Sequence, residues 1–175
     1  MKKWFLWTLL ATLLFGLAVH LAVVAYIPYK AMDTVMNVRF KELPRNAMVF
    51  SPPTTVESRN VPRPSPDILY SVCVYDVSRK PLLITCPLPH GYWSASFYAD
   101  NTDNFFAIND MQVKSNPVKL LLIGKNSTES VAGDAIVVRA QSDKGLVLVR
   151  MLVLDDKSLP ALIDVQQKAT CRQLD

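Results

Sequence analysis

The sequence predicts a mainly β domain of β-sandwich or jelly-roll-like type with a C-terminal helix, preceded by one N-terminal transmembrane helix. Two observations carry this prediction. Beyond residue 66, short runs rich in β-branched and aromatic residues alternate with turn residues, and one long apolar run occupies the start of the chain. The length of 175 residues is that of about one domain. Half of them are hydrophobic and 19% are charged, which excludes a disordered chain.

The apolar run extends from Trp4 to Ile27 and contains no Lys, Arg, Asp or Glu. As a helix it is roughly 36 Å long, and the hydrocarbon core of a bilayer is about 30 Å thick. Aromatic residues suited to the membrane interface flank the run, and Pro28 is predicted to end the helix. We therefore predict a signal anchor at 4–27 behind a basic tail at 1–3, with the N-terminus in the cytoplasm. A cleaved signal peptide is the alternative, because a basic tail before an apolar run is common to both.

A proline-rich stalk is predicted to connect the anchor to the β domain, over residues 28–66. The apolar positions in its first part, 29–47, have the spacing of a short helix. From residue 43 to 66, prolines recur among Ser, Thr and Asn, which favours an extended chain. The β domain then occupies 67–175.

Seven strand-like runs follow at intervals of roughly 8 to 15 residues, the spacing of a sandwich or barrel. They are 68–76, 82–86, 92–99, 104–108, 118–123, 135–140 and 146–154. Residues 146–149 are apolar at odd and even positions alike, which predicts a strand covered on both faces, by the last helix or by a partner chain. That helix is predicted from Ser158, as its N-cap, to about Lys168, with an apolar face that closes the sheet.

No catalytic residue, metal site or cofactor is predicted. His90 is the one histidine outside the apolar run, which excludes a site with several His ligands, and its neighbours Pro89 and Gly91 are typical of a turn. The glycines form no phosphate-binding loop. The polar run 100–104 favours a hairpin turn over a calcium loop, because it lacks the Gly and Glu of an EF-hand. The sequence contains no dense basic stripe, so a nucleic-acid partner is not expected.

Two polar groups are candidate ligand-binding positions. One lies where the proline-rich stalk meets the strand 68–76, and it forms either a pocket wall or a latch in which an arginine and a carboxylate pair. The other lies around the turn 100–104, where aromatic residues of the preceding strand contact a carbohydrate or fill the core. The candidate residues are Arg63, Asp67, Tyr70, Trp93, Tyr98, Asp100 and Asn104.

The three cysteines allow one disulfide within the predicted strands. If 68–76 and 82–86 form a hairpin, Cys73 and Cys86 face each other, and a disulfide between them is permitted outside the cytoplasm. Cys171 is then left for an intermolecular bond or as a free thiol. Two buried thiols that act as small hydrophobic groups are the alternative.

Several of these segments resemble a bacterial-type family, the domain of unknown function 1254. Residues 61–71 read V-P-R-P-S-P-D-I-L-Y-S, where the family typically reads V-R-P-N-P-D-T-L-Y-S, and the likeness covers about 49–170. The resemblance implies a jelly-roll-like β domain, which in longer members stands beside a second β domain, the domain of unknown function 1214. We expect the short, membrane-anchored subtype without that second domain, and a separate protein that carries it as the partner.

Together these features predict a non-enzymatic, single-pass protein of the bacterial inner membrane whose C-terminal β domain lies in the periplasm and binds a partner protein. Neither a nucleic acid nor a cofactor is expected. The alternative is a ligand-binding or hydrolytic envelope domain that acts on cell-surface carbohydrate or a small molecule. That alternative would use Asp67, Asp76 and Asp100 together with the aromatic residues.

Overall fold

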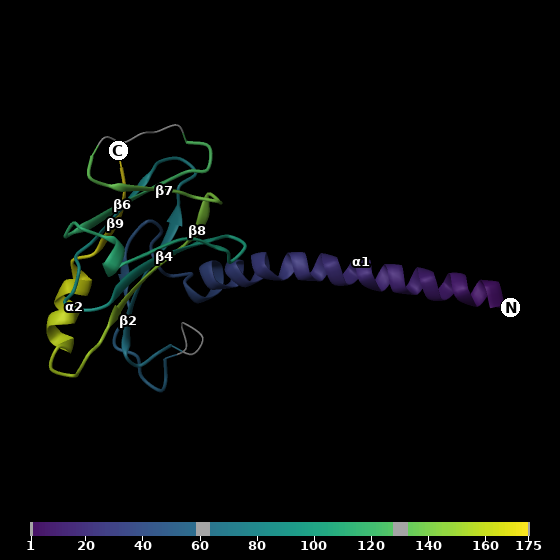
Figure 1. Ribbon diagram of the computed structural model, residues 1–175, viewed down its shortest axis with the longest axis horizontal. Helices are drawn as coiled ribbons and strands as arrows, with labels where there is room; N and C mark the ends of the chain where they lie inside the picture. Colours follow the sequence, from purple (N-terminus) through teal and green to yellow (C-terminus); the bar gives the residue numbers. More distant parts are fainter. Residues whose placement is uncertain (1, 59–63, 128–132, 175) are drawn as a thin grey trace.

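A long helix projects from a β domain in the computed structural model, which describes residues 2–58, 64–127 and 133–174. The helix, α1 (Lys2–Thr34), continues into a π-helical turn, η1 (Val35–Arg39). Figure 1 shows α1 extending away from one side of the domain, with α2 (Leu159–Gln167) on the opposite side. By length and composition α1 is able to cross a membrane. Pro28 lies inside α1, so the predicted helix end at this residue is wrong.

The β domain consists of two sheets, as the sequence predicts. The five-stranded sheet has the order β1-β2-β8-β4-β5, and the four-stranded sheet has the order β7-β6-β3-β9. The pairing of β6 with β7 is parallel, so the second sheet is mixed. The strands are β1 (Val49–Phe50), β2 (Ile68–Asp76), β3 (Leu82–Cys86), β4 (Trp93–Ala99), β5 (Asn104–Asn109), β6 (Val118–Ile123), β7 (Ile136–Arg139), β8 (Lys144–Leu152) and β9 (Thr170–Gln173).

All seven predicted strands form, with ends that differ from the prediction by at most two residues. Strands β1 and β9 were not predicted, because they are short and lack an alternating apolar pattern. Both depend on a longer neighbour, since β1 pairs with β2 and β9 pairs with β3. The C-terminal helix is confirmed, but the Ser158 side chain does not cap it, because its hydroxyl donates to the Asp155 carbonyl at 2.8 Å.

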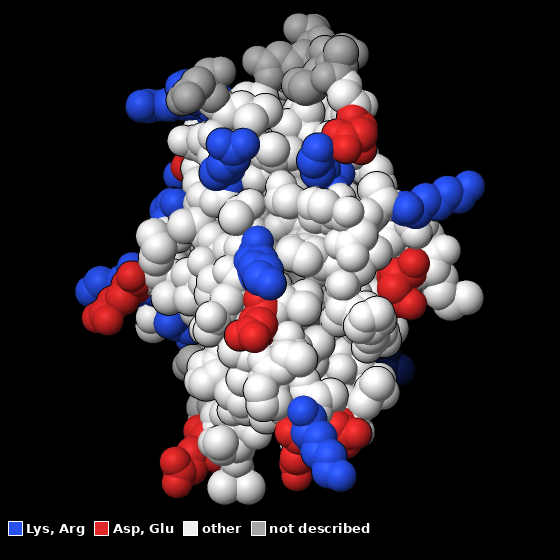
Figure 2. Space-filling view, turned by 90° about the vertical axis from the view of Figure 1, so that its left-hand side faces the viewer, with Lys and Arg blue, Asp and Glu red and all other residues white. Residues whose placement is uncertain are grey.

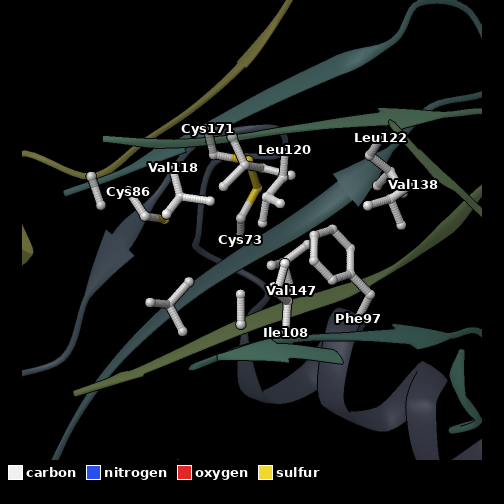
Figure 3. Close-up of a cluster of buried hydrophobic side chains, with 14 of the residues drawn as sticks. Cys73, Cys86, Phe97, Ile108, Val118, Leu120, Leu122, Val138, Val147 and Cys171 are labelled. Atoms are coloured by element: carbon white, nitrogen blue, oxygen red, sulfur yellow. A yellow bond between two sulfur atoms is a disulfide. The ribbon is translucent and has the colours of Figure 1, made fainter. Parts of the chain in front are cut away.

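The inner faces of the two sheets share one hydrophobic core (Figure 3). A disulfide between Cys73 on β2 and Cys171 on β9 crosses this core and joins the two sheets. The predicted bond between Cys73 and Cys86 is therefore wrong, because β3 pairs with β6 and β9 and forms no hairpin with β2. Cys86 is a free, buried thiol, and burial raises its pKa to about 12.

The end of the N-terminal helix packs against the outer face of the five-stranded sheet. Met32 and Met36 are only 5% and 6% exposed, and with Phe40 they form a second apolar cluster with side chains of β2 and β8. The sheet residues in this cluster are Val72, Val74, Tyr98, Leu146 and Leu148. The predicted two-sided cover of residues 146–149 is confirmed, but α1 and η1 supply the outer cover in place of α2 or a partner chain. This docking fixes the β domain at the end of α1.

Candidate functional site

The structure separates the first group of candidate residues. Arg63 lies outside the described residues. Asp67 is exposed, and its backbone carbonyl accepts a hydrogen bond from the Val153 N–H at 2.8 Å. The Tyr70 hydroxyl accepts a hydrogen bond from the Ser65 N–H at 3.0 Å. Tyr70 therefore holds the proline-rich segment against the sheet.

The second group is also dispersed. Trp93 is fully buried in the core, and Tyr98 packs beneath the end of α1, so both aromatic rings have packing roles. Asn104 is exposed at the start of β5. The turn between β4 and β5 is the predicted hairpin, closed by the Ala99 N–H donating to the Asp103 carbonyl at 2.9 Å. Asp100 lines a cavity.

This cavity, of about 810 Å³, lies between the end of α1 and one edge of the five-stranded sheet. Its helical wall is formed by Tyr29, Asp33, Met36 and Asn37. Its other wall comes from the segments that follow β2, β4 and β6 and from the turn that precedes β8. Because β8 runs antiparallel between β2 and β4, the last residues of β2 and β4 lie beside the first residues of β8, at the same edge of the sheet. The charged residues around the cavity are Asp33, Asp100, Lys125, Asp143 and Lys144.

Asp76, at the end of β2, contacts two residues that line the cavity, Ser78 and Lys144. Its carboxylate accepts hydrogen bonds from the Ser78 hydroxyl at 2.6 Å and the Ser78 N–H at 3.1 Å, and Lys144 Nζ lies 3.6 Å away. Partial burial acts to raise the pKa of Asp76, but the bonds from Ser78 and the charge of Lys144 outweigh it and hold the pKa below its ordinary value. Asp76 is therefore an anionic partner that orients Lys144.

The low pKa of Asp76 predicts a pH dependence of stability. Asp76 contributes stability above its unfolded-state pKa of about 3.9, and this contribution is lost as the pH falls through the lower folded-state value. We expect the Asp76→Asn variant to be less stable than the wild type at pH 7, by about 1 kcal/mol or less because the ion pair is exposed to solvent. The difference should shrink below pH 4 in thermal unfolding of the full chain in detergent micelles.

The matched control for this prediction is Asp156→Asn, which removes an exposed carboxylate that makes no hydrogen bond or ion pair within the described parts of the chain. The stability of this control should follow the wild type at every pH. A gap between the wild type and Asp76→Asn that stays constant from pH 7 to pH 3 would contradict the prediction.

Tightly packed residues form the adjoining end of the core. The buried Tyr75 hydroxyl donates to the Tyr98 carbonyl at 3.1 Å. Burial raises the pKa of Tyr75 to about 12, and the nearby charges of Asp100 and Asp143 act in the same direction. Gly145 lies opposite Tyr75 in the strand pairing, where an added Cβ would collide with the Tyr98 carbonyl oxygen. The carboxylates of Asp100 and Asp143 thus both lie near the Tyr75 hydroxyl, at the tightly packed end of the core.

A polar row crosses the outer face of the same sheet. Strand pairing aligns Tyr70, Arg150 and Ser94 on β2, β8 and β4. The Arg150 guanidinium donates to the Ser96 hydroxyl at 3.0 Å, whereas Arg150 Nε and Ser94 Oγ are buried without a hydrogen-bond partner in the described chain. This row has no lining residue in common with the cavity.

Of the charged residues that line the cavity, Asp100 was predicted from the sequence and the others were not. Asp33 and Asn37 are four residues apart, a spacing that places both on one face of a helix beyond the apolar run, and this signal was available in the sequence. Lys125, Asp143 and Lys144 carry no such local signal, because they reach the cavity only through the strand order. Across the described residues, His, Cys, Asp and Glu form no group of three that could hold a metal ion.

Solved structures that are similar to this chain include the following two. The VPA0106 protein from Vibrio parahaemolyticus matches with a TM-score of 0.67 and 18% identity, over 89% of this chain and 38% of that protein. An uncharacterised protein from Burkholderia cenocepacia matches with a TM-score of 0.55 and 18% identity, over 82% of this chain and 39% of that protein. The chain thus spans about two fifths of the length of these structures, and at this identity the likeness shows the fold alone. No curated protein matches the sequence.

A family match covers most of the chain. Residues 45–173 match the family described as "Protein of unknown function (DUF1254)". The matched range runs from just before β1 to the last residue of β9, so it contains every strand of both sheets. It also contains the segments on which the sequence resemblance rests. The chain belongs to the DUF1254 family.

Proposed function

We propose that this chain is a non-enzymatic, single-pass protein of the bacterial inner membrane whose β domain lies in the periplasm and binds a partner protein. The observation that carries the proposal is the docking of a β domain on the end of a helix that is long and apolar enough to span a bilayer. The proposed partner is an envelope protein that carries a domain of the DUF1214 type.

Two features of the structure support this location. The helix α1 is long and apolar enough to span a bilayer, and its last turns are docked on the β domain, which would hold the domain at the membrane surface. The disulfide between Cys73 and Cys171 suits an oxidising compartment, because disulfides persist in the periplasm and are rare in the cytoplasm.

The charge distribution agrees with a protein partner better than with a nucleic acid. Figure 2 shows the side of the domain turned away from α1, where basic and acidic side chains are interspersed and separated by wide uncharged areas. A nucleic-acid surface would gather lysines and arginines in one stripe. A mixed surface of this kind is compatible with a protein interface, which excludes charge mainly from its centre.

The test is co-purification of the full-length, tagged chain at native expression, after crosslinking in intact cells and extraction in mild detergent. The expected result is one envelope protein recovered in a fixed ratio to the chain, from the membrane fraction. The control bait is the same N-terminal segment, residues 1–47, fused to an unrelated folded domain, which should not recover that protein. Repeated recovery of the intact chain from the membrane without a partner in a fixed ratio would reject the proposal.

Ligand binding is the second candidate function, and the cavity beside α1 is the observation that favours it. Its volume of about 810 Å³ falls within the range of roughly 300 to 1,000 Å³ that is usual for small-molecule sites. The two functions are compatible, because the cavity occupies the side of the β domain that faces α1.

A further inference from the structure

We propose that the cavity between α1 and the β domain binds the headgroup of a zwitterionic phospholipid that carries a primary ammonium. The ammonium would lie against Asp100 and Asp143, and the phosphate would lie against Lys125. This inference goes beyond partner binding and rests on the proposed insertion of α1 in the membrane. Three observations carry it: the depth of the cavity, the charges that remain unpaired around it, and the rigidity of its walls.

The lower rim of the cavity lies at the depth of the headgroup layer. Tyr29, the first residue of the helical wall, follows the apolar run by two residues, which corresponds to a rise of about 3 Å along the helix. Asp33 lies about 9 Å above the end of the run by the same measure. The polar layer on each side of a bilayer is about 5 to 7 Å thick. The cavity therefore begins within that layer at Tyr29 and extends above it, so a lipid headgroup meets its lower rim.

The charges around the cavity have the composition of a zwitterion site. Lys30 pairs with Asp33 at 3.2 Å, and Lys144 is held by Asp76. Within the described segments, the carboxylates of Asp100 and Asp143 and the ammonium of Lys125 have no hydrogen-bond or ion-pair partner. These groups are complementary to a ligand with one ammonium and one phosphate, through charge-assisted hydrogen bonds.

The lining also discriminates among headgroups. A primary ammonium donates three hydrogen bonds, which carboxylates accept, whereas a quaternary choline donates none and is usually held by a cage of aromatic rings. Among the described residues that line this cavity, Tyr29 is the one aromatic residue. An anionic headgroup without an amine would leave both carboxylates unpaired and close to its phosphate. Ethanolamine lipids therefore fit better than choline or glycerol lipids.

The walls of the cavity are fixed before any ligand arrives. Met32 and Met36 are buried against the sheet on the same helical segment that carries Asp33 and Asn37. On the other wall, the Asp100 N–H donates to the Ser142 hydroxyl at 2.9 Å, and the same hydroxyl donates to the Lys144 carbonyl at 2.7 Å. A preformed site of this kind loses little conformational entropy when it binds.

The test is lipid retention by the full-length chain in nanodiscs that contain equal amounts of phosphatidylethanolamine, phosphatidylcholine and phosphatidylglycerol. After transfer to mild detergent, native mass spectrometry counts the lipids that stay bound. We expect phosphatidylethanolamine to exceed each of the other two by at least about tenfold, because only its headgroup has an ammonium that donates charge-assisted hydrogen bonds to the two carboxylates. In the double variant Asp100→Asn with Asp143→Asn, the excess should disappear. The matched control, Asp156→Asn with Asp164→Asn, removes two exposed carboxylates outside the cavity and should retain it.

Each other outcome overturns the inference. Equal retention of the three lipids, or an unchanged excess in the Asp100 and Asp143 variant, rejects headgroup binding while protein in the nanodisc preserves the proposed anchoring. Failure of the chain to enter nanodiscs rejects both. Glycerophosphoethanolamine, added to the chain in phosphatidylcholine nanodiscs, distinguishes the source of the ligand. Its binding without any retention of phosphatidylethanolamine would assign the cavity to a soluble amino-phosphate and reject the lipid.

Discussion

Replacement of Cys171 by serine is expected to lower the free energy of unfolding of the β domain by about 3 to 5 kcal/mol. The disulfide between Cys73 and Cys171 joins positions 98 residues apart and links the two sheets. Without it, the unfolded chain gains the entropy of a long open loop, and β9 loses its covalent tie to the five-stranded sheet. Urea unfolding of the full chain in mild detergent, followed by the fluorescence of the buried Trp93, measures the loss.

The control for this prediction uses the third cysteine. Reductant should destabilise the wild type and the Cys86→Ala variant alike, because Cys86 is outside the disulfide. The same reductant should leave Cys171→Ser unchanged. Thiol titration of the denatured, unreduced wild type should find one thiol per chain. Three thiols, or a wild type that is indifferent to reductant, would contradict the disulfide.

Replacement of Met36 by alanine is expected to weaken the docking of α1 on the β domain by about 2 to 4 kcal/mol, the usual cost of removing a buried methionine side chain. Met36 is 6% exposed and belongs to the cluster that covers Val74 and Leu146 on the outer face of the sheet. Faster amide hydrogen exchange in residues 32–43 of the full chain in detergent micelles would report the loosened contact.

Val38→Ala is the matched control for the Met36 variant. Val38 lies on the same π-helical turn but is 68% exposed, so its replacement should change stability by about 0.5 kcal/mol or less. If the two variants exchange at the same rate, the helix end is not held by this cluster. Because η1 and the end of α1 form one wall of the cavity, Met36→Ala should also reduce retention of phosphatidylethanolamine.

Most elements of this fold were predictable because their signals are local. The strands β2, β3 and β6 have the predicted bounds, since β-branched and aromatic residues and flanking turn residues act over a few positions. The C-terminal helix follows from its own apolar spacing. The length and composition of the apolar run likewise predicted a helix able to span a bilayer, although packing of Met32 and Met36 extends it beyond Pro28.

The candidate site was far less predictable. From the sequence, Trp93 was a candidate for ligand contact, yet the fold buries its ring completely. Tyr98 packs against the end of α1, a contact that no local sequence pattern predicts. Asp100 was named, whereas Lys125 and Asp143 lie in separate turns that are remote in sequence. Such residues meet only when β2, β8 and β4 align their ends at one edge of the sheet.

By itself, the sequence determined an apolar N-terminal helix, a two-sheet β domain, a C-terminal helix and the resemblance to the DUF1254 family. The tertiary structure alone decided that Cys73 bonds to Cys171, that the end of α1 covers the sheet, and that a charged cavity lies between them. The reason is physical. Propensity and periodicity act between neighbours in the chain, whereas strand order and disulfide pairing depend on contacts between segments whose separation the chain does not encode locally.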